Sequence, residues 1–192
     1  FRAMDKRANI FLVGPMGTGK TTIGRHLAKA LQMTFYDSDQ VIEERTGADI
    51  PWIFDLEGEA GFRRREAAVI DELTRAREVV IATGGGAVLD AKNRQRLKQR
   101  GVVVYLHTDA ELLARRTAKD SKRPLLQTAD PAQKLRDLMA VREPLYRSIA
   151  DITLVTSDYT IRGAVKVLVQ KLSQKSRTKA PVAEKKPKAS GA

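Results

Sequence analysis

The sequence predicts an α/β fold in which a five-stranded parallel sheet is flanked by helices. From Asn9 to Leu172, short apolar segments alternate with segments of helical periodicity, which is the rhythm of parallel βαβ units. A glycine-rich segment joins the first apolar run to the first helical pattern, as at the ligand-binding end of such sheets. The 192 residues suffice for one such domain with a sizeable core.

Each strand is expected where a short apolar run is bounded by turn residues. The five expected strands are Asn9–Val13, Thr34–Tyr36, Val79–Thr83, Val102–Leu106 and Ile152–Thr156. Helices are expected from about Lys20, over Gln40–Arg45, from Asp90 to Gln99, over Ala110–Thr117, from Asp130 to about Val141 and over Thr160–Leu172. Asp90 and Asp130 are suitable N-caps, and Pro131 fits a first helical position.

Composition excludes several classes of protein. The chain has no cysteine and two histidines, so disulfides, thiolate metal sites and histidine-rich metal sites are excluded. No apolar run approaches the roughly 20 residues needed to span a bilayer. The N-terminus has no long apolar stretch like that of a signal peptide, so a cytoplasmic protein is expected.

Both ends of the chain differ from the segment between them. Residues 1–8 are expected to be an N-terminal extension, of which the first three residues precede Met4 and are interpreted as a remnant of cloning. Residues 173–192 are rich in Lys, Ala, Ser and Pro and carry +5 of the net charge of +12. They have too little apolar surface to offset chain entropy, so this tail is predicted to be disordered.

The strongest motif is Gly14-Pro-Met-Gly-Thr-Gly-Lys-Thr21, which matches the P-loop pattern G-x-x-x-x-G-K-[ST] in full. Its glycines let backbone N–H groups point at phosphate oxygens, and the following helix adds its positive end. Lys20 is expected to reach the β- and γ-phosphates of ATP, and the Thr21 hydroxyl to bind Mg²⁺. The alternative is an ordinary glycine-rich turn.

Asp37 and Asp39 follow the second expected strand. In an extended backbone they would share a face and look into the ligand crevice, where one could hold hydrated Mg²⁺ and the other accept a proton. The alternative, equally supported by the spacing, is a capping pair for the helix Gln40–Arg45.

Other segments are suggestive only in combination. Gly61-Phe-Arg-Arg-Arg-Glu66 offers planar guanidinium groups, of which at most two can face a site, and Arg63 could pair with Glu66. Gly84-Gly85-Gly86 ends a buried strand and would let the backbone approach a ligand. Basic pairs at 115–116 and 122–123 could close over phosphates. Taken singly, a solvated helix face is the better explanation of the arginines and a plain turn that of the glycines, and the basic pairs could be surface charge.

From Asn9 to Leu172 the chain closely resembles the shikimate kinase family, because six segments occur in that family's order and at similar intervals. They are GPMGTGKT, YDSD, FRRRE, ATGGG, KRPLL and REPLY. The resemblance implies a P-loop kinase fold like that of nucleoside monophosphate kinases, with a substrate-binding region at 37–66 and a lid at 115–128. It implies transfer of the ATP γ-phosphate to the 3-hydroxyl of shikimate, in aromatic amino acid biosynthesis.

The resemblance also implies roles for residues that match the family's motifs. Asp39, Lys20 and Arg123 would be catalytic, and Asp39, Arg63, Gly85 and Arg142 would bind shikimate. ATP would be bound by Gly17, Thr18, Gly19, Lys20, Thr21, Thr22, Arg116, Arg123 and, on weaker grounds, Tyr159. Thr21 and Asp37 would hold Mg²⁺, Asp37 through water.

Two other functions are kept as alternatives. Another small-metabolite kinase of the same fold, such as a gluconate kinase, would keep the P-loop but should not need the FRRRE, GGG and REPLY segments together. The basic charge also suggests nucleic-acid binding through the tail, but aromatic residues are 5% of the chain, which is a poor supply of stacking platforms. A monomer with ATP and shikimate as its partners is expected, with no membrane and no obligate nucleic acid.

Overall fold

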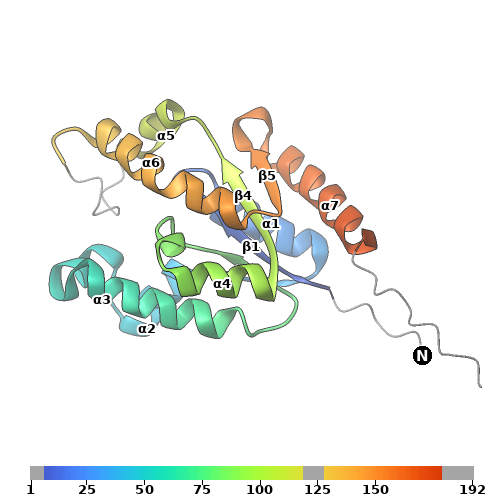
Figure 1. Cartoon of the computed structure of the whole chain (residues 1–192), viewed down its shortest axis with the longest axis horizontal. Helices are drawn as coiled ribbons and strands as arrows, with labels where there is room; N and C mark the ends of the chain where they lie inside the picture. The colour runs from blue at the N-terminus through green and yellow to red at the C-terminus, as the bar shows by residue number, and fades with distance from the viewer. Residues whose placement is uncertain (1–6, 119–127, 179–192) are drawn as a thin grey trace, which may run out of the picture.

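The computed structural model describes residues 7–118 and 128–178, without side chains for the last three of these residues. At its centre is a five-stranded sheet in the order β2-β3-β1-β4-β5, with every neighbouring pair parallel (Figure 1). The strands are β1 (Asn9–Val13), β2 (Thr34–Asp37), β3 (Val79–Ala82), β4 (Gly101–His107) and β5 (Ile152–Val155). The predicted fold class is therefore confirmed, and each strand end lies within one residue of its expected position.

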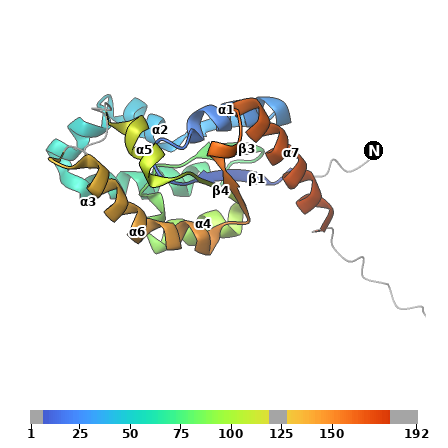
Figure 2. The same ribbon diagram turned by 90° about the horizontal axis from the view of Figure 1, so that it is seen from above.

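Helices connect the strands and cover both faces of the sheet. They are α1 (Lys20–Leu31), α2 (Ser38–Thr46), α3 (Ile50–Leu73), α4 (Ala91–Arg100), α5 (Ala110–Thr117), α6 (Pro131–Ile149) and α7 (Ile161–Thr178), with 3-10 turns η1 (Ala87–Leu89) and η3 (Thr156–Asp158). Figure 2 shows α1 and α7 on one side of the sheet and α4 and α6 on the other. Two large cores result, one under α1 and α7 and one under α3, α4 and α6, and a smaller apolar cluster joins Met16 to α5 and α6.

Two helices end later than the sequence predicts. Helix α6 continues past Val141 to Ile149, through Pro144, because Tyr146 and Ile149 are buried against the sheet and hold the last turns in place. Helix α7 continues past Leu172 to Thr178, and an ion pair of 3.4 Å joins Lys175 Nζ to Asp151 Oδ1. Disorder from residue 173 is therefore wrong for 173–178, while residues 179–192 lie outside the described residues.

Helix α3 is not among the helices expected above, and it bends. Asp49 caps its N-terminus by accepting a hydrogen bond from the backbone N–H of Trp52. Gly58 then leaves helical geometry with φ 70° and ψ 179°, a backbone conformation that favours glycine. The bend brings Phe62 and Glu66, beyond Gly58, into buried positions.

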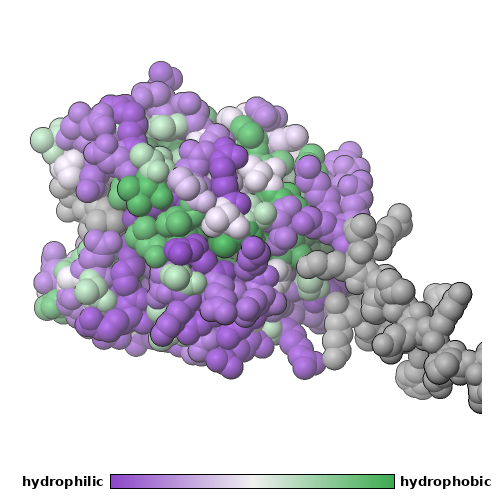
Figure 3. Space-filling view, viewed as in Figure 1, coloured by the Kyte–Doolittle hydropathy of each residue, from purple (hydrophilic) through white to green (hydrophobic). Residues whose placement is uncertain are grey.

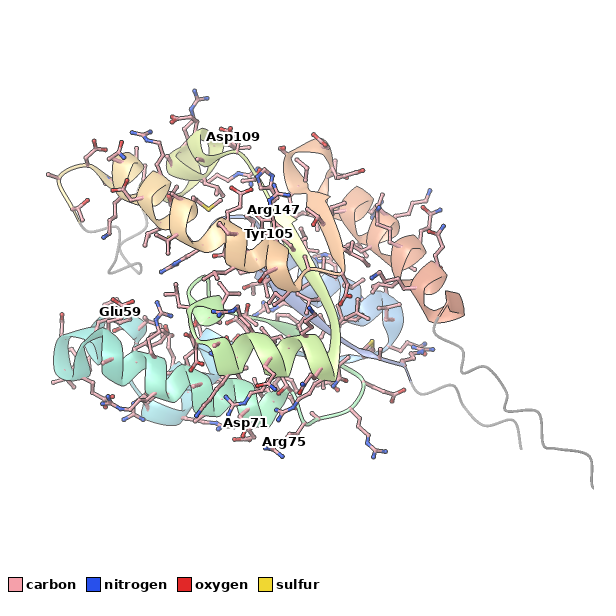
Figure 4. All side chains as sticks on the ribbon, in the orientation of Figure 1. Glu59, Asp71, Arg75, Tyr105, Asp109 and Arg147 are labelled. Carbon is pink, nitrogen blue, oxygen red and sulfur yellow. The ribbon has the colours of Figure 1, made fainter. Side chains whose placement is uncertain are left out.

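The surface over α3 and α4 is strongly polar. Figure 3 shows hydrophilic residues over most of this face, with hydrophobic residues mainly in a central band. Near the lower edge in Figure 4, Asp71 pairs with Arg75, Arg96 and Arg100 at 2.9–3.1 Å. Among the described residues, no helix combines the length and the apolar composition that crossing a membrane requires.

Helix α4 depends on very few buried side chains, which makes its anchorage testable. Leu97 is fully buried, and Asn93 donates a hydrogen bond of 3.1 Å to the carbonyl of Ala87, but the rest of the helix is largely polar. We expect Leu97→Ala to lower the free energy of unfolding by about 2–5 kcal/mol, from lost burial and the cavity left behind. Urea denaturation measures this loss. The exposed neighbour Lys98 is the control, and Lys98→Ala should change stability by less than about 0.5 kcal/mol. Equal effects would contradict the assignment of Leu97 as the anchor.

Candidate active site

The P-loop has the backbone geometry that phosphate binding requires. Gly14, Gly17 and Gly19 have φ angles of 145°, 82° and 88°, and α1 begins directly after Gly19. Thr18 Oγ1 donates to the carbonyl of Pro15 at 3.0 Å and closes the turn. The loop is therefore an open ring of backbone N–H groups at a helix N-terminus, a preformed site for an anion.

Lys20 is folded back into this loop. Its ammonium group donates to the carbonyl oxygens of Gly14 and Pro15 at 2.8 and 2.7 Å, and the side chain is largely buried. These contacts hold a positive charge at the centre of the ring without a ligand. A positive charge therefore lies within the loop that the motif predicts to bind phosphates.

Asp37 caps a helix and also lines the cavity at the P-loop. It is the last residue of β2, and its Oδ1 caps α2 by accepting from the backbone N–H groups of Asp39 and Gln40 at 3.0 and 3.2 Å. Its Oδ2 accepts the Thr21 hydroxyl at 2.5 Å. Asp39 lies in the first turn of α2, so the expectation that both residues share a face of an extended segment is wrong. The helical turn still brings the Asp39 side chain to the same cavity.

A cavity of about 390 Å³ opens where β1, β2 and β3 end. It is lined by Met16, Gly17, Gly19, Lys20, Thr21, Thr22, Asp37, Asp39, Thr83, Gly84 and Gly85. The structure thus brings the P-loop, both predicted aspartates and the triple glycine together. Of the expected site residues that the structure describes, five lie outside this lining: Thr18, Arg63, Arg116, Arg142 and Tyr159.

Two carboxylates meet at Gly84. A Cβ placed on this glycine would lie 2.7 Å from Asp39 Oδ1 and 2.8 Å from Glu66 Oε2, and neither oxygen has a hydrogen-bond partner among the described residues. The pKa of Asp39 is raised to about 7, chiefly by burial and then by the negative charges of Glu66 and Asp37. The positive charges of Lys20 and Arg63 lower this pKa by less. Asp39 therefore changes its protonation state near neutral pH.

Two guanidinium groups approach the glycine strip, which is the segment Gly84–Gly86. Arg63 pairs with Glu66 at 2.8 Å, as the sequence suggested, and with Glu59 at 3.3 Å. Arg142 is buried and forms no ion pair within the described part of the chain. Burial lowers the pKa of Arg142, and the charge of Arg63 lowers it as well. This concentration of positive charge suits an anionic group of a ligand.

The remaining arginines of the FRRRE segment behave as the solvated alternative predicts. Arg64 is exposed, and Arg65 forms an ion pair of 2.6 Å with Glu57 on the outside of α3. Only Arg63 is turned toward the glycine strip, where a Cβ on Gly86 would collide with its guanidinium. One arginine of the three thus belongs to the site.

The nucleotide-side residues are less closely gathered. Arg116, on α5, donates to the carbonyl of Gly17 at 3.3 Å and so lies beside the P-loop. Tyr159 is substantially exposed, follows η3 and does not line the cavity. Arg123 and residues 119–127 of the expected lid lie outside the described residues.

Four further residues shape the site without having been singled out from the sequence. Ser38 Oγ accepts from the N–H of Gly84 at 3.1 Å, and Thr83 Oγ1 donates to the carbonyl of Leu12 at 2.9 Å. Glu66 was noted only as a partner of Arg63. Tyr146 donates to the carbonyl of Gly85 at 2.5 Å. Each lies inside or next to a quoted motif, but its role depends on contacts across 46 or more residues of chain, except for Glu66.

The donor set at Thr21 and Asp37 fits a hard cation such as Mg²⁺. Thr21 donates its hydroxyl proton to Asp37, so its oxygen lone pairs are directed elsewhere. Within the described ranges, no group of three or more His, Cys, Asp or Glu residues could hold a metal by itself. That suits an ion bound chiefly by water and substrate phosphates, as Mg²⁺ commonly is.

Comparison with known proteins agrees with this site. The family model for shikimate kinase matches residues 16–173. A shikimate kinase of Acinetobacter baumannii strain AYE is 56% identical over 173 residues, which are 90% of this chain and 94% of that protein. A solved shikimate kinase from A. baumannii in complex with shikimate superposes with a TM-score of 0.80 at 55% identity, covering 90% of this chain and 94% of the other.

A kinase for a different acceptor shares only the fold. A solved gluconokinase from Sinorhizobium meliloti 1021 has a TM-score of 0.61 at 17% identity and covers 91% of this chain and 97% of its own. The relatives with high sequence identity described above are shikimate kinases, whereas the likeness to this gluconokinase is one of fold. By its sequence, its fold and the residues gathered at the ends of its parallel strands, this chain belongs to the shikimate kinase family.

Proposed function

We propose that this protein transfers the γ-phosphate of ATP to the 3-hydroxyl of shikimate, giving ADP and 3-phosphoshikimate, a step of aromatic amino acid biosynthesis. The observation that carries this proposal is the joining of a P-loop, a carboxylate with a pKa of about 7 and a pair of converging arginines at one end of the sheet. The first binds a nucleotide, the second can take a proton from an alcohol, and the third binds a carboxylate.

The nucleotide is bound by the P-loop. Backbone N–H groups of residues 17–22 surround its β- and γ-phosphates, and Lys20 exchanges its two carbonyl contacts for phosphate oxygens. Arg116 is already beside Gly17 and can cover the nucleotide from α5. Arg123 and Tyr159 stay predictions as ATP contacts, the first on the expected lid.

Thr21 and, through water, Asp37 would hold the Mg²⁺ that accompanies ATP. When bound, the ion neutralises phosphate charge during transfer. The hydrogen bond from Thr21 to Asp37 fixes the hydroxyl so that its oxygen is available to a cation. Because Asp37 also caps α2, the position of this helix and of Asp39 is coupled to the occupancy of the site.

Asp39 is the proposed general base. Its carboxylate accepts the proton of the 3-hydroxyl as the hydroxyl oxygen forms a bond to the γ-phosphorus and the bond to the β-phosphate oxygen breaks. A base with a pKa near the working pH is effective in both accepting and releasing this proton. Lys20 and Arg123 offset the charge on the transferred group.

Arg63 and Arg142 form the proposed carboxylate clamp, and the N–H of Gly85 adds a donor beside them. Gly85 and Arg142 adjoin, since a Cβ on Gly85 would lie 3.5 Å from Arg142 Nη1. A guanidinium group matches a carboxylate in two-point geometry, which gives such a clamp its selectivity. Shikimate carries both the carboxylate and the vicinal hydroxyls that this arrangement requires.

A coupled assay of ADP release with MgATP tests the proposal directly, with shikimate, gluconate and nucleoside monophosphates as separate acceptors. Turnover with shikimate alone is expected. Preference for gluconate would overturn the proposal in favour of another small-metabolite kinase, the alternative that 17% identity to a gluconokinase supports only at the level of fold. The cytoplasmic location, the monomeric state and nucleic-acid adhesion through the tail stay predictions.

The role of Lys20 in the P-loop can be tested by substitution. Lys20→Ala should lower kcat at least about a hundredfold, the scale for loss of one preorganised charge at a transferring group. The melting temperature, followed by circular dichroism, should change little because Lys20 contacts loop carbonyls and leaves both cores untouched. Turnover close to that of the wild type would contradict the role.

The proposed base Asp39 and its neighbour Glu66 give a prediction about pH dependence. The kcat/KM for shikimate should rise with pH and reach half of its plateau near pH 7, because only deprotonated Asp39 accepts a proton and its pKa is about 7. Glu66→Gln removes a like charge that raises this pKa, so the midpoint should move to lower pH. Glu59→Gln is the matched control, since Glu59 also pairs with Arg63 but is not among the main charges that shift the pKa of Asp39. An unmoved midpoint in Glu66→Gln would count against the coupling.

The proposed carboxylate clamp can be tested by replacing its arginines. Arg63→Ala or Arg142→Ala should weaken shikimate binding by about 1.5–3 kcal/mol, the scale of a hydrogen bond to a charged group, with MgATP affinity little changed. Arg→Lys should also weaken binding, since it keeps the charge but loses the planar fork. Calorimetry with shikimate and its methyl ester checks the target. Equal wild-type affinity for acid and ester would mean that these arginines are not a carboxylate clamp.

A further inference from the structure

Tyr146 is fully buried on α6, yet it carries a polar group that reaches the substrate side of the site. Its hydroxyl donates to the carbonyl of Gly85 at 2.5 Å. Its ring is stacked on Tyr105 of β4, with centroids 5.2 Å apart and an interplanar angle of 25°. The ring therefore has a fixed position, and the hydroxyl at its tip is held at one point of the glycine strip.

The same phenol oxygen also faces Arg142. The two residues are four positions apart on α6 and so lie on one face of the helix. The contact between the phenol and the guanidinium contributes to the pKa of both side chains. Among the described residues Arg142 has no carboxylate in ion-pair contact, and its buried Nε has no hydrogen-bond partner. The phenol oxygen is thus a principal polar neighbour of this guanidinium.

We infer that Tyr146 is a positioning residue, whose hydroxyl fixes the Gly85 backbone and the Arg142 guanidinium relative to each other and so sets the geometry in which they bind the substrate carboxylate. This inference rests on the proposed function, in which Gly85 and Arg142 contact shikimate. Gly85 belongs to the turn after β3, and Arg142 belongs to α6. The Tyr146 hydroxyl donates to the Gly85 carbonyl and lies on the same face of α6 as Arg142, whose Nη1 would be 3.5 Å from a Cβ on Gly85.

The physical reason is the conformational freedom that the two groups would otherwise have. A glycine backbone has wide conformational freedom, and an arginine without an ion pair has several rotamers available. Binding a carboxylate between two such groups costs entropy unless they are already ordered. A buried hydroxyl that donates to one and faces the other supplies this order before the substrate arrives.

The test is Tyr146→Phe, with Tyr105→Phe as its matched control. Both changes remove one buried hydroxyl from stacked rings, but the Tyr105 hydroxyl has no hydrogen-bond partner among the described residues. Figure 4 shows Tyr105 beside Arg147, whose guanidinium lies over its ring. Tyr146→Phe should raise the KM and the calorimetric Kd for shikimate about five- to tenfold, as for one ordinary hydrogen bond, with kcat and the KM for MgATP little changed. Tyr105→Phe should leave all four values close to those of the wild type.

A merely structural role would give a different result. Loss of packing would lower the melting temperature and affect both substrates, whereas loss of positioning affects shikimate alone. The preference for shikimate over its methyl ester should also shrink in Tyr146→Phe, because the carboxylate is the group that the ordered pair recognises. If Tyr146→Phe is unstable, the comparison is made at low temperature with saturating MgATP, which stabilises the folded state by mass action.

The outcomes separate this inference from the proposed function. Wild-type protein that neither binds shikimate nor prefers it to the ester would overturn the proposed function. Wild-type protein that does both, together with a Tyr146→Phe variant indistinguishable from Tyr105→Phe, would overturn the role of Tyr146 alone. A rise in KM for both substrates in Tyr146→Phe would likewise reject a role specific to the carboxylate.

Discussion

The parallel pairing of β1 with β3 and of β3 with β2 is the constraint on which the site depends. Because the strands run in the same direction, their carboxyl ends lie at one edge, with Leu12 opposite Ala82 and Ala82 opposite Asp37. The P-loop, the Asp37–Asp39 turn and the triple glycine follow these three strands directly. Segments that are far apart in the chain, from Met16 to Gly85, therefore form one cavity without any long or irregular connection.

Positive and negative side chains occupy different parts of this cavity and its surroundings, and their positions suit the two proposed ligands. Lys20 places a cation where phosphates would bind, while Asp39 and Glu66 bring two carboxylate oxygens together at Gly84. Arg63 compensates Glu66, but Arg142 has no comparable partner within the described residues. Burial, and after it the like charges of Glu66 and Asp37, raise the pKa of Asp39 to about 7, and concentrated cationic charge is neutralised when an anion binds. The site is thus arranged to change its charge when substrates arrive.

Precision in the substrate half comes from side chains that do not themselves need to touch the substrate. Ser38 holds the N–H of Gly84, Tyr146 holds the carbonyl of Gly85, and Glu66 orients Arg63. These contacts restrain a glycine strip that would otherwise be mobile, while its lack of side chains keeps room for carboxylates and guanidinium groups. The glycine backbone is therefore held in place by side chains of neighbouring elements, although its own residues are conformationally free.

The sequence by itself determined the parts of this protein that are governed by local chemistry. Strand positions followed from short apolar runs, α1 from the P-loop, and the family from six motifs in order, because each signal is contained in a few consecutive residues. The lengths of α6 and α7 were underestimated, since their final turns are held by packing and by an ion pair with distant residues. Asp37 could be assigned neither to capping nor to the cavity until the structure gave each of its oxygens a separate partner. Only the tertiary structure decided that Asp39 meets Glu66 and that Tyr146 joins Gly85 to Arg142, because burial and contact between remote segments have no signature in local sequence.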